Sequence, residues 1–336
     1  MSGGSVPYHL RQNKSVERAI FVEALNRIGR ATPAPIQHYG YVGFAGPFSE
    51  DFKLIHSQVG IREFVSVEND EHVHQRQLWN CPLKGIDYRR ISSGAFIDAF
   101  DSAGPTIVWL DYASPREIES QLNEVQSLVS KMSDYDILKV TFNASAATLG
   151  HDPSDDQNTG PLRAERARQR LGAFLGAGFD ITPDDVDRKG YPQLVLKAAE
   201  LALKQGMAGN SKSRFQPITT FTYADSAHTM LTLTGVLLPE GKVTTFMQTS
   251  GITKWDLATR KWGSPRTVPI DIAVPEMSLR ERLFVDQQLP TRRRAQTLMK
   301  QLGFRLGGRV DEDTISALSS YSTFYRYFPY FSKMVI

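Results

Sequence analysis

The sequence predicts an α/β fold in which helices cover both faces of a mainly parallel sheet, and two observations lead to this prediction. Between residues 39 and 143, five strand-like apolar runs alternate with helical segments. This alternation is typical of βαβ units with right-handed crossovers. Two β-rich runs over 215–239, around the turn residues 224–226, then predict an antiparallel hairpin. The expected architecture is a Rossmann-like αβα sandwich with parallel strands and a C-terminal antiparallel hairpin.

The individual elements follow from apolar periodicity and from turn residues. Buried strands are expected where apolar residues run together, at 39–45, 62–68, 85–92, 105–112 and 134–143. Helices are expected where apolar residues recur at helical spacing, at 15–28, 49–60, 69–80, 94–100, 115–132, 161–176 and 190–206. Ser15, Ser49 and Pro115 are the expected first-turn or capping residues of three of these helices.

The organisation changes along the chain, and we expect three parts. An N-terminal helical segment (1–35) precedes a Rossmann-like domain (36–239) that carries a helical insertion at about 150–210. A mostly helical extension (240–336) follows, with a short β-prone run at 242–249 and helices near 278–288, 291–302 and 311–326.

Composition excludes several classes of protein. Of the 336 residues, 41% are hydrophobic and 22% are charged, as in ordinary soluble domains. The sequence has no apolar run long enough for a membrane-spanning helix, and its first residues lack the apolar region of a secretory signal, so a cytoplasmic location is the expectation. Cys81 is the single cysteine, so neither an internal disulfide nor a cysteine-based zinc site is expected, and no metal is predicted.

A glycine-bearing loop directly follows the first expected strand. Gly43 and Gly46, with Ala45 and Phe48 beside them, let a ligand approach the backbone, and the N–H groups opening the next helix favour an anionic group. Glu68 ends the second strand about 25 residues later, where a carboxylate can accept both hydroxyl hydrogens of a ribose. A simple negative charge at the start of helix 69–80 explains Glu68 as well.

Two further polar segments end strands three and four. Ser92, Ser93 and Gly94 follow the third strand, where a turn and a helix N-cap are the alternative explanation. The fourth strand ends at Asp111, followed by Tyr112. The Asp111 carboxylate can accept a hydrogen bond from an amine or hydroxyl and orient it for attack, although it can equally cap the following helix.

Five parallel strands followed by an antiparallel hairpin, with these residues at the strand ends, resemble class I S-adenosylmethionine-dependent methyltransferases over residues 36–238. Within this superfamily the chain looks like the group labelled "putative O-methyltransferases". The resemblance implies S-adenosylmethionine as cofactor and Asp111 and Tyr112 as catalytic residues facing donor and acceptor. It implies that the donor is held by Gly43, Ala45, Gly46, Phe48, Glu68, Asn69 and Ser93, and that the acceptor contacts Arg11, Asn13, Lys14 and Ser114.

The sequence also departs from the superfamily pattern. Tyr41 stands where an acidic residue is usual, Pro47 or Phe48 replaces a third glycine, and no Pro-Pro pair follows Asp111. A catalytically inactive methyltransferase-like scaffold that binds a partner protein or nucleic acid is therefore the alternative. A dinucleotide oxidoreductase is the weaker option, because the loop lacks Gly-x-Gly-x-x-Gly.

The sequence does not decide whether the methyl acceptor is a nucleic acid or a small molecule, and several basic residues are relevant to this question. The net charge of +3 neither demands nor excludes nucleic-acid binding. A solvated helix face with Glu165 as a local partner explains the insertion arginines adequately, although they are also compatible with a basic surface; these are Arg163, Arg166, Arg168 and Arg170. Arg292–Arg294 and the aromatic run 320–333 are a second candidate, for which a small core or a partner interface is the simpler explanation.

Overall fold

An eight-stranded sheet organises the computed structural model, which describes residues 11–102, 104–151, 158–176, 178–260, 262–263, 267–290, 294–306 and 310–328. The strand order across the sheet is β3-β2-β1-β4-β5-β7-β6-β8. The strands are β1 (Gly40–Gly43), β2 (Glu63–Val67), β3 (Ile86–Arg89), β4 (Thr106–Asp111), β5 (Ile137–Asn143), β6 (Ser213–Asp225), β7 (His228–Pro239) and β8 (Ile270–Ile272).

The pairing of these strands confirms the predicted fold class. Strands β1 to β5 are parallel, whereas β7 runs antiparallel to both β5 and β6. One strand was not predicted: β8, from the segment after residue 240, pairs in parallel with β6 at the edge of the sheet. Three residues are too few to show an alternating pattern, so a strand this short leaves little signal in the sequence.

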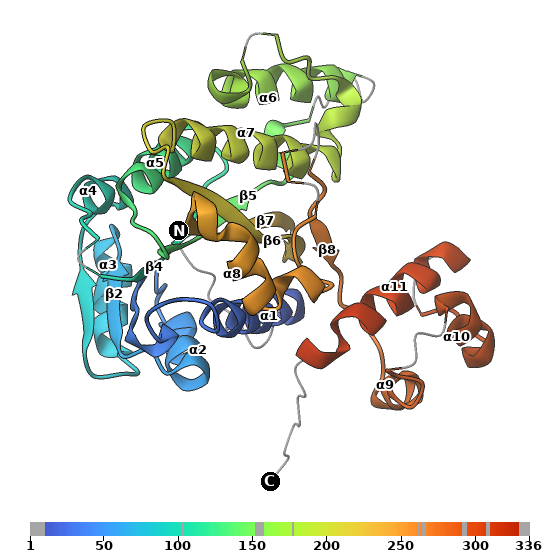
Figure 1. Cartoon of the computed structure of the whole chain (residues 1–336). Coiled ribbons are helices and arrows are strands. Elements are labelled where there is room, and N and C mark those ends of the chain that lie inside the picture. Colours follow the sequence, from blue (N-terminus) through green and yellow to red (C-terminus); the bar gives the residue numbers. More distant parts are fainter. Residues whose placement is uncertain are drawn as a thin grey trace.

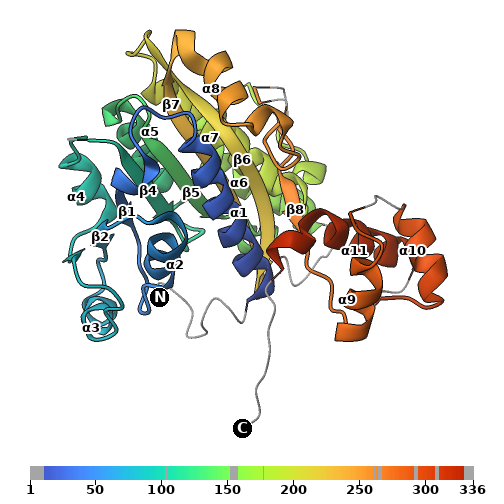
Figure 2. The same ribbon diagram turned by 60° about the horizontal axis from the view of Figure 1, so that its bottom comes forward.

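Helices cover both faces of the sheet (Figures 1 and 2). Helices α5, α6 and α7 lie on one side, and α1, α2 and α8 lie on the other, while α9, α10 and α11 form a group beyond the β8 edge. The helices are α1 (Gln12–Ile28), α2 (Glu50–Val59), α3 (Glu71–Trp79), α4 (Ser93–Asp98), α5 (Ile118–Lys131), α6 (Thr159–Leu175), α7 (Gly190–Gly206), α8 (Val243–Thr249), α9 (Leu279–Asp286), α10 (Ala295–Leu302) and α11 (Asp311–Phe324). Short 3-10 helices lie at Ile36–His38, Ala146–Leu149, Pro183–Val186, Glu240–Lys242, Ile252–Lys254 and Tyr325–Tyr327.

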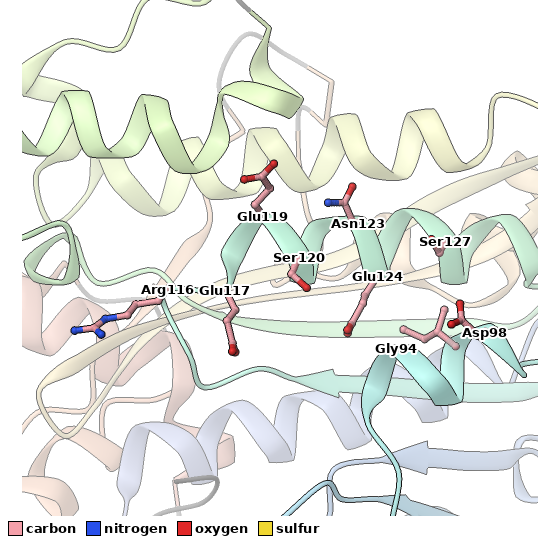
Figure 3. A pocket seen from close by; sticks show the side chains of 10 residues that line it. Gly94, Asp98, Arg116, Glu117, Glu119, Ser120, Asn123, Glu124 and Ser127 are labelled. Atoms are coloured by element: carbon pink, nitrogen blue, oxygen red, sulfur yellow. The ribbon is translucent and has the colours of Figure 1, made fainter.

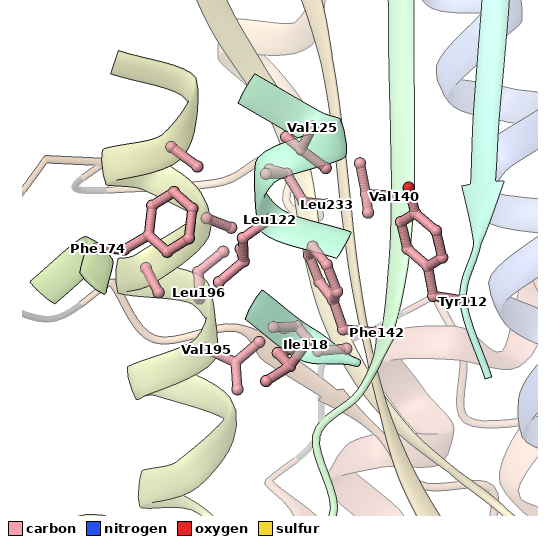
Figure 4. Packing of buried hydrophobic residues seen from close by; sticks show 14 of the residues in the cluster. Tyr112, Ile118, Leu122, Val125, Val140, Phe142, Phe174, Val195, Leu196 and Leu233 are labelled. Carbon is pink, nitrogen blue, oxygen red and sulfur yellow. The ribbon is translucent and has the colours of Figure 1, made fainter. Parts of the chain in front are cut away.

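Alternation along the central strands produces two hydrophobic cores. In β5, Leu138, Val140 and Phe142 pack against α5 and α7 on one face, as Figure 4 shows for Val140 and Phe142. Ile137 on the same strand belongs to the second core, which α1 and α2 complete. Every residue of β5 is buried, as expected of a strand covered by helices on both faces.

Four local predictions were wrong. The β-prone run 242–249 is helix α8, because Val243, Phe246 and Met247 recur at helical spacing and pack into the α1-side core. Helix α5 begins at Ile118, so Pro115 lies outside it. Neither predicted serine cap holds: α1 begins at Gln12, N-terminal to the predicted cap at residue 15, and the residue before α2, Ser49, has a φ of 50° and makes no capping hydrogen bond.

Candidate functional site

The topology singles out one edge of the sheet. Strand β1 has β2 on one side and β4 on the other. From β1 the chain first adds β2 and β3 toward one edge of the sheet, and then crosses back to add β4 and β5 toward the other edge. Ligands of open α/β sheets bind beyond the carboxyl ends of the strands at such a switch point. The loop after Gly43 and the segment after Asp111 therefore frame the candidate site.

The loop between β1 and α2 has a specific backbone conformation. Gly46 has a φ of 57°, in the left-handed region that favours glycine. A side chain at Gly43 would bring its Cβ to 3.4 Å from the Trp109 carbonyl oxygen on β4. The loop is anchored from outside by Asn80, whose Nδ2 donates to the Pro47 oxygen at 2.8 Å. Phe48, at the end of the loop, lies under the Arg76 guanidinium, 5.3 Å from its ring centre.

Glu68 lies at the end of β2, where the sequence placed it, with 7% of its surface exposed. Its Oε1 accepts a hydrogen bond from the backbone N–H of Asp70 at 2.8 Å, so the carboxylate has a set orientation at the start of α3. Asp70 itself caps α3, which makes Glu68 unnecessary as the cap. Asn69 is exposed beside Glu68. Ser93 is the first residue of α4, partly exposed after β3.

Asp111 and Tyr112 point to opposite faces of the sheet, so the structure does not bring them together. The Tyr112 ring stacks on Phe142 in the α5-side core, with 6.0 Å between ring centres (Figure 4). Its hydroxyl donates to Glu124 of α5 at 2.5 Å. Burial and the Glu124 charge raise the Tyr112 pKa far above its ordinary value, so the phenol stays protonated. The ring edge also contacts Phe44 in the β1–α2 loop.

Asp111 instead belongs to a buried group of charges between α1 and the sheet. The Arg18 guanidinium is at its centre and stacks over the Trp109 ring at 4.5 Å. Arg18 lies 3.4 Å from Asp111 and 3.4 Å from Asp51 on α2. It also donates to the Tyr223 hydroxyl on β6 at 2.9 Å. We call Glu17, Arg18, Asp51, Asp111, Lys139 and Tyr223 the buried charge cluster.

A second ion pair completes this cluster within the sheet. The Lys139 ammonium, from the middle of β5, contacts the Glu17 carboxylate of α1, and both side chains are 1% exposed. Lys139 also lies 4.4 Å from the centre of the Phe21 ring. Glu17 reaches the Arg18 guanidinium as well, at 2.9 Å. Removing charged groups from water is costly unless each is paired with a charge of opposite sign. The cluster meets this requirement, because its buried charges compensate one another.

The cluster sets the protonation of its members. Burial disfavours the charged form of Asp111, but the positive charges of Lys14 and Arg18 outweigh burial and lower its pKa. Asp51 behaves differently, because burial raises its pKa more than Arg18 and Lys14 lower it. Burial also lowers the pKa of Lys139. Asp111 is therefore a carboxylate at neutral pH, with 17% of its side chain exposed, and it accepts hydrogen bonds while being a weak base.

The predicted acceptor residues of the N-terminal segment meet the end of the β6–β7 hairpin. Arg11 forms an ion pair with Asp225 at 2.9 Å, and the Lys14 ammonium lies 3.8 Å from the same carboxylate. Asn13 donates to the Ala224 oxygen and accepts from the Val274 N–H. These side chains reach the edge that carries Asp111. Ser114, the fourth predicted contact, lies in the loop after β4 and is partly exposed. Its backbone oxygen accepts a hydrogen bond from the Gln121 side chain of α5.

A cavity of about 550 Å³ lies beside the site, between α4 and α5 (Figure 3). Glu124 projects into it from α5 and Glu117 from the residue just before that helix, and Glu124 lies beside Gly94 of α4. Glu124 also accepts from Tyr112, so the wall of the cavity is connected to the end of β4. The lining residues are Gly94, Ile97, Asp98, Arg116, Glu117, Glu119, Ser120, Asn123, Glu124 and Ser127.

The described part of the chain has neither a cluster of metal-binding side chains nor a membrane-spanning helix. Its histidine, cysteine, aspartate and glutamate side chains nowhere form a group of three that could hold a metal ion. Within the same residues, every helix is too short or too polar to cross a membrane.

Comparison with known proteins decides the family. A model of the family described as "Putative O-methyltransferase" matches residues 6–336. The chain belongs to this family. The match extends through α9, α10 and α11. It confirms the methyltransferase class that the strand order and strand-end residues predicted.

Solved structures similar to this O-methyltransferase family member share little sequence with it. Trm1 from Pyrococcus horikoshii, solved with S-adenosyl-L-methionine, is 11% identical and covers 92% of this chain and 76% of its own, with a TM-score of 0.44. The N-methyltransferase NodS from Bradyrhizobium japonicum is 10% identical and covers 67% and 97%, with a TM-score of 0.37. No curated protein matches the chain.

Sequence reasoning missed most of the buried charge cluster. Lys139 was the available signal, because a lysine within the apolar run Ile137–Phe142 needs a buried partner. Glu17 and Arg18, between buried apolar residues of the first helix, were the candidates for that partner. Their meeting depends on how α1 packs against the sheet, which no local pattern reveals.

Proposed function

We propose that this protein is an S-adenosylmethionine-dependent methyltransferase whose donor binds between the β1–α2 loop and Glu68. The observation that carries the proposal is the family match over residues 6–336, together with the position of these groups at the switch point of the sheet. When bound, S-adenosylmethionine supplies an electrophilic methyl group.

The residues present fit such a donor. Gly46, with its φ of 57°, lets the loop backbone turn toward the site without an obstructing side chain. Glu68 is held by the Asp70 N–H, and its carboxylate suits a ribose diol. Ser93 begins the helix after the neighbouring strand β3, and we assign it to the adenine end of the donor. The Tyr41 ring, buried against Phe52 and Phe64, replaces the usual acidic group, so the donor's remaining contacts come from the loop backbone.

On the acceptor side, we assign Asp111 the orienting role. Its carboxylate is ionised and fixed by Arg18, so it accepts a hydrogen bond from an acceptor hydroxyl or amine and aligns the attacking atom. Orientation of this kind accounts for much of the rate of group transfer. Because the pKa of Asp111 is lowered, Asp111 orients the nucleophile more than it removes its proton. The Tyr112 ring contacts Phe44, and through this contact it packs against the β1–α2 loop of the proposed donor site.

Isothermal titration with S-adenosylmethionine and S-adenosylhomocysteine tests the proposal. We expect micromolar binding by the unchanged protein and a loss of about tenfold or more in Glu68→Ala, since a bidentate charged hydrogen bond is worth roughly 1.5–3 kcal/mol. Glu63→Ala is the matched control, because Glu63 is exposed at the opposite end of the same strand. The absence of binding at millimolar ligand would contradict the proposal and favour a methyltransferase-like scaffold that binds a partner.

A further inference from the structure

Three arginines of the insertion helix α6 lie on one side of it. Arg163, Arg166 and Arg170 are spaced three and four residues apart, so their side chains leave the helix within one narrow arc. Their α-carbons span roughly 10 Å along the helix axis. Arg166 is exposed and the other two are partly exposed. We call these three residues the arginine row.

Each side chain of the arginine row is held in place by backbone oxygens of the loops at the carboxyl edge. Arg163 Nε donates to the Gly150 oxygen, and Arg166 Nη1 donates to the Leu149 oxygen, both at 2.8 Å. Arg170 donates to two loops, to the Thr148 oxygen at 3.1 Å and to the Pro115 oxygen at 3.3 Å.

In the described part of the chain, no carboxylate neutralises the charge of the arginine row. Among the residues that the structure describes, none of the three guanidinium groups forms an ion pair. The nearest acidic residue on the helix, Glu165, pairs instead with Arg168 at 2.7 Å. A guanidinium has five N–H donors, and the contacts with backbone oxygens use one or two of them. Three positive charges thus stand side by side, already ordered, with donors left over.

The position of the arginine row connects it with the proposed site. Thr148 follows β5, and Pro115 follows Asp111 by four residues at the end of β4. Arg170 therefore bridges the two loops that border the acceptor side of the sheet. The arginine row thus lies over the same carboxyl edge of the sheet as Asp111, on the side that α5, α6 and α7 cover.

We propose that the arginine row binds a phosphate group of the methyl acceptor. Guanidinium groups match phosphate oxygens in pairs, and ordered side chains lose little entropy on binding. The phosphate belongs either to a nucleic-acid backbone or to a small phosphorylated molecule, and both present the same chemistry. The assignment of this phosphate to the methyl acceptor rests on the proposed function, whereas phosphate binding by the row does not.

Binding measurements on the full chain test this inference. The probes are inorganic phosphate, followed by calorimetry, and a labelled single-stranded oligothymidylate of about 12 nucleotides, followed by fluorescence anisotropy. The double variant Arg163→Gln/Arg166→Gln removes two members of the row and leaves Arg170, which holds the loops. Arg168→Gln is the matched control, because it removes one arginine of the same helix whose charge Glu165 already compensates.

We expect binding of at least one probe, weakened about tenfold or more in the double variant and changed less than about twofold in Arg168→Gln. Much tighter binding of the oligonucleotide than of phosphate would identify a nucleic-acid backbone, and similar affinities would identify a small phosphorylated acceptor. Equal binding by the double variant and the unchanged protein, or no binding of either probe, would overturn the inference. Titration of the unchanged protein and of the double variant with S-adenosylmethionine separates phosphate binding from the proposed methyltransferase function. Absence of donor binding would contradict only the methyltransferase function.

Discussion

The Arg18 guanidinium lies 3.4 Å from the Asp111 carboxylate and joins helix α1 to the end of strand β4. The same guanidinium contacts Asp51 on α2 and the Tyr223 hydroxyl on β6. One side chain, 2% exposed, thus ties four elements together behind the candidate site. Its role is to keep the Asp111 carboxylate charged and fixed at the carboxyl edge of the sheet.

Replacing Arg18 with methionine should destabilise the protein strongly. The change leaves Asp51 and Glu17 without their shared partner in a buried environment, and breaking a buried ion pair in this way costs about 3–5 kcal/mol. Urea denaturation measures the free energy of unfolding. Arg30→Gln, an exposed arginine just beyond α1, should change it by less than about 0.5 kcal/mol. If the Arg18 variant lost as little unfolding free energy as Arg30→Gln, the buried charge cluster would not depend on Arg18.

Stability should fall in acid, and Glu17 should account for part of the loss. Burial opposes ionisation of Glu17, but Lys139 and Arg18 outweigh it and lower its pKa. A lowered pKa means that the unfolded chain binds more protons in acid. The stabilisation is therefore present above the ordinary glutamate pKa of about 4.3 and is lost as the pH falls through the folded-state pKa. Asp51, with its raised pKa, acts in the opposite direction.

The measurement is the free energy of unfolding between about pH 6 and pH 3. Glu17→Gln should flatten the decline toward low pH, since glutamine does not titrate. The slope of the unchanged protein over the same pH range is the reference. An unchanged slope in Glu17→Gln would contradict this account of the cluster.

Gly46 should be required for donor binding in a way that another left-handed glycine is not. Gly46 and Gly60 lie near opposite ends of α2, with φ values of 57° and 84°. Alanine at either position should cost about 1–2 kcal/mol of stability, the usual penalty for a side chain in the left-handed region. Only Gly46→Ala should also weaken S-adenosylmethionine binding, by about tenfold. Equal donor affinities in the two variants, measured by calorimetry, would remove the β1–α2 loop from the proposed site.

Tyr112 should act through its ring rather than its hydroxyl. Tyr112→Phe removes the hydrogen bond to Glu124 and should lower the free energy of unfolding by about 1.5–3 kcal/mol, with donor affinity unchanged. Tyr112→Ala also removes the contact with Phe44 and should weaken donor binding. If Tyr112→Phe weakened donor binding as much as Tyr112→Ala does, the hydroxyl itself would have to contact the ligand.

Local sequence patterns were enough to predict the alternation of strands and helices, the antiparallel hairpin, and the residues at the strand ends. These features depend on local apolar runs and spacing: helix α7 was predicted at 190–206 and is Gly190–Gly206. Glu68 was likewise predicted at the end of β2, because the strand and the helix that bound it are both evident locally.

The pairing of the charged side chains, by contrast, depends on contacts between elements far apart in the sequence. Lys139 meets Glu17 across 122 residues of sequence, and Arg18 meets Asp111 across 93. Asp111 and Tyr112 are neighbours in sequence, yet the pleat of β4 sends them to opposite cores. The pairing of buried charges depends on which helix covers which face, and hydrophobic packing over the whole sheet sets that arrangement.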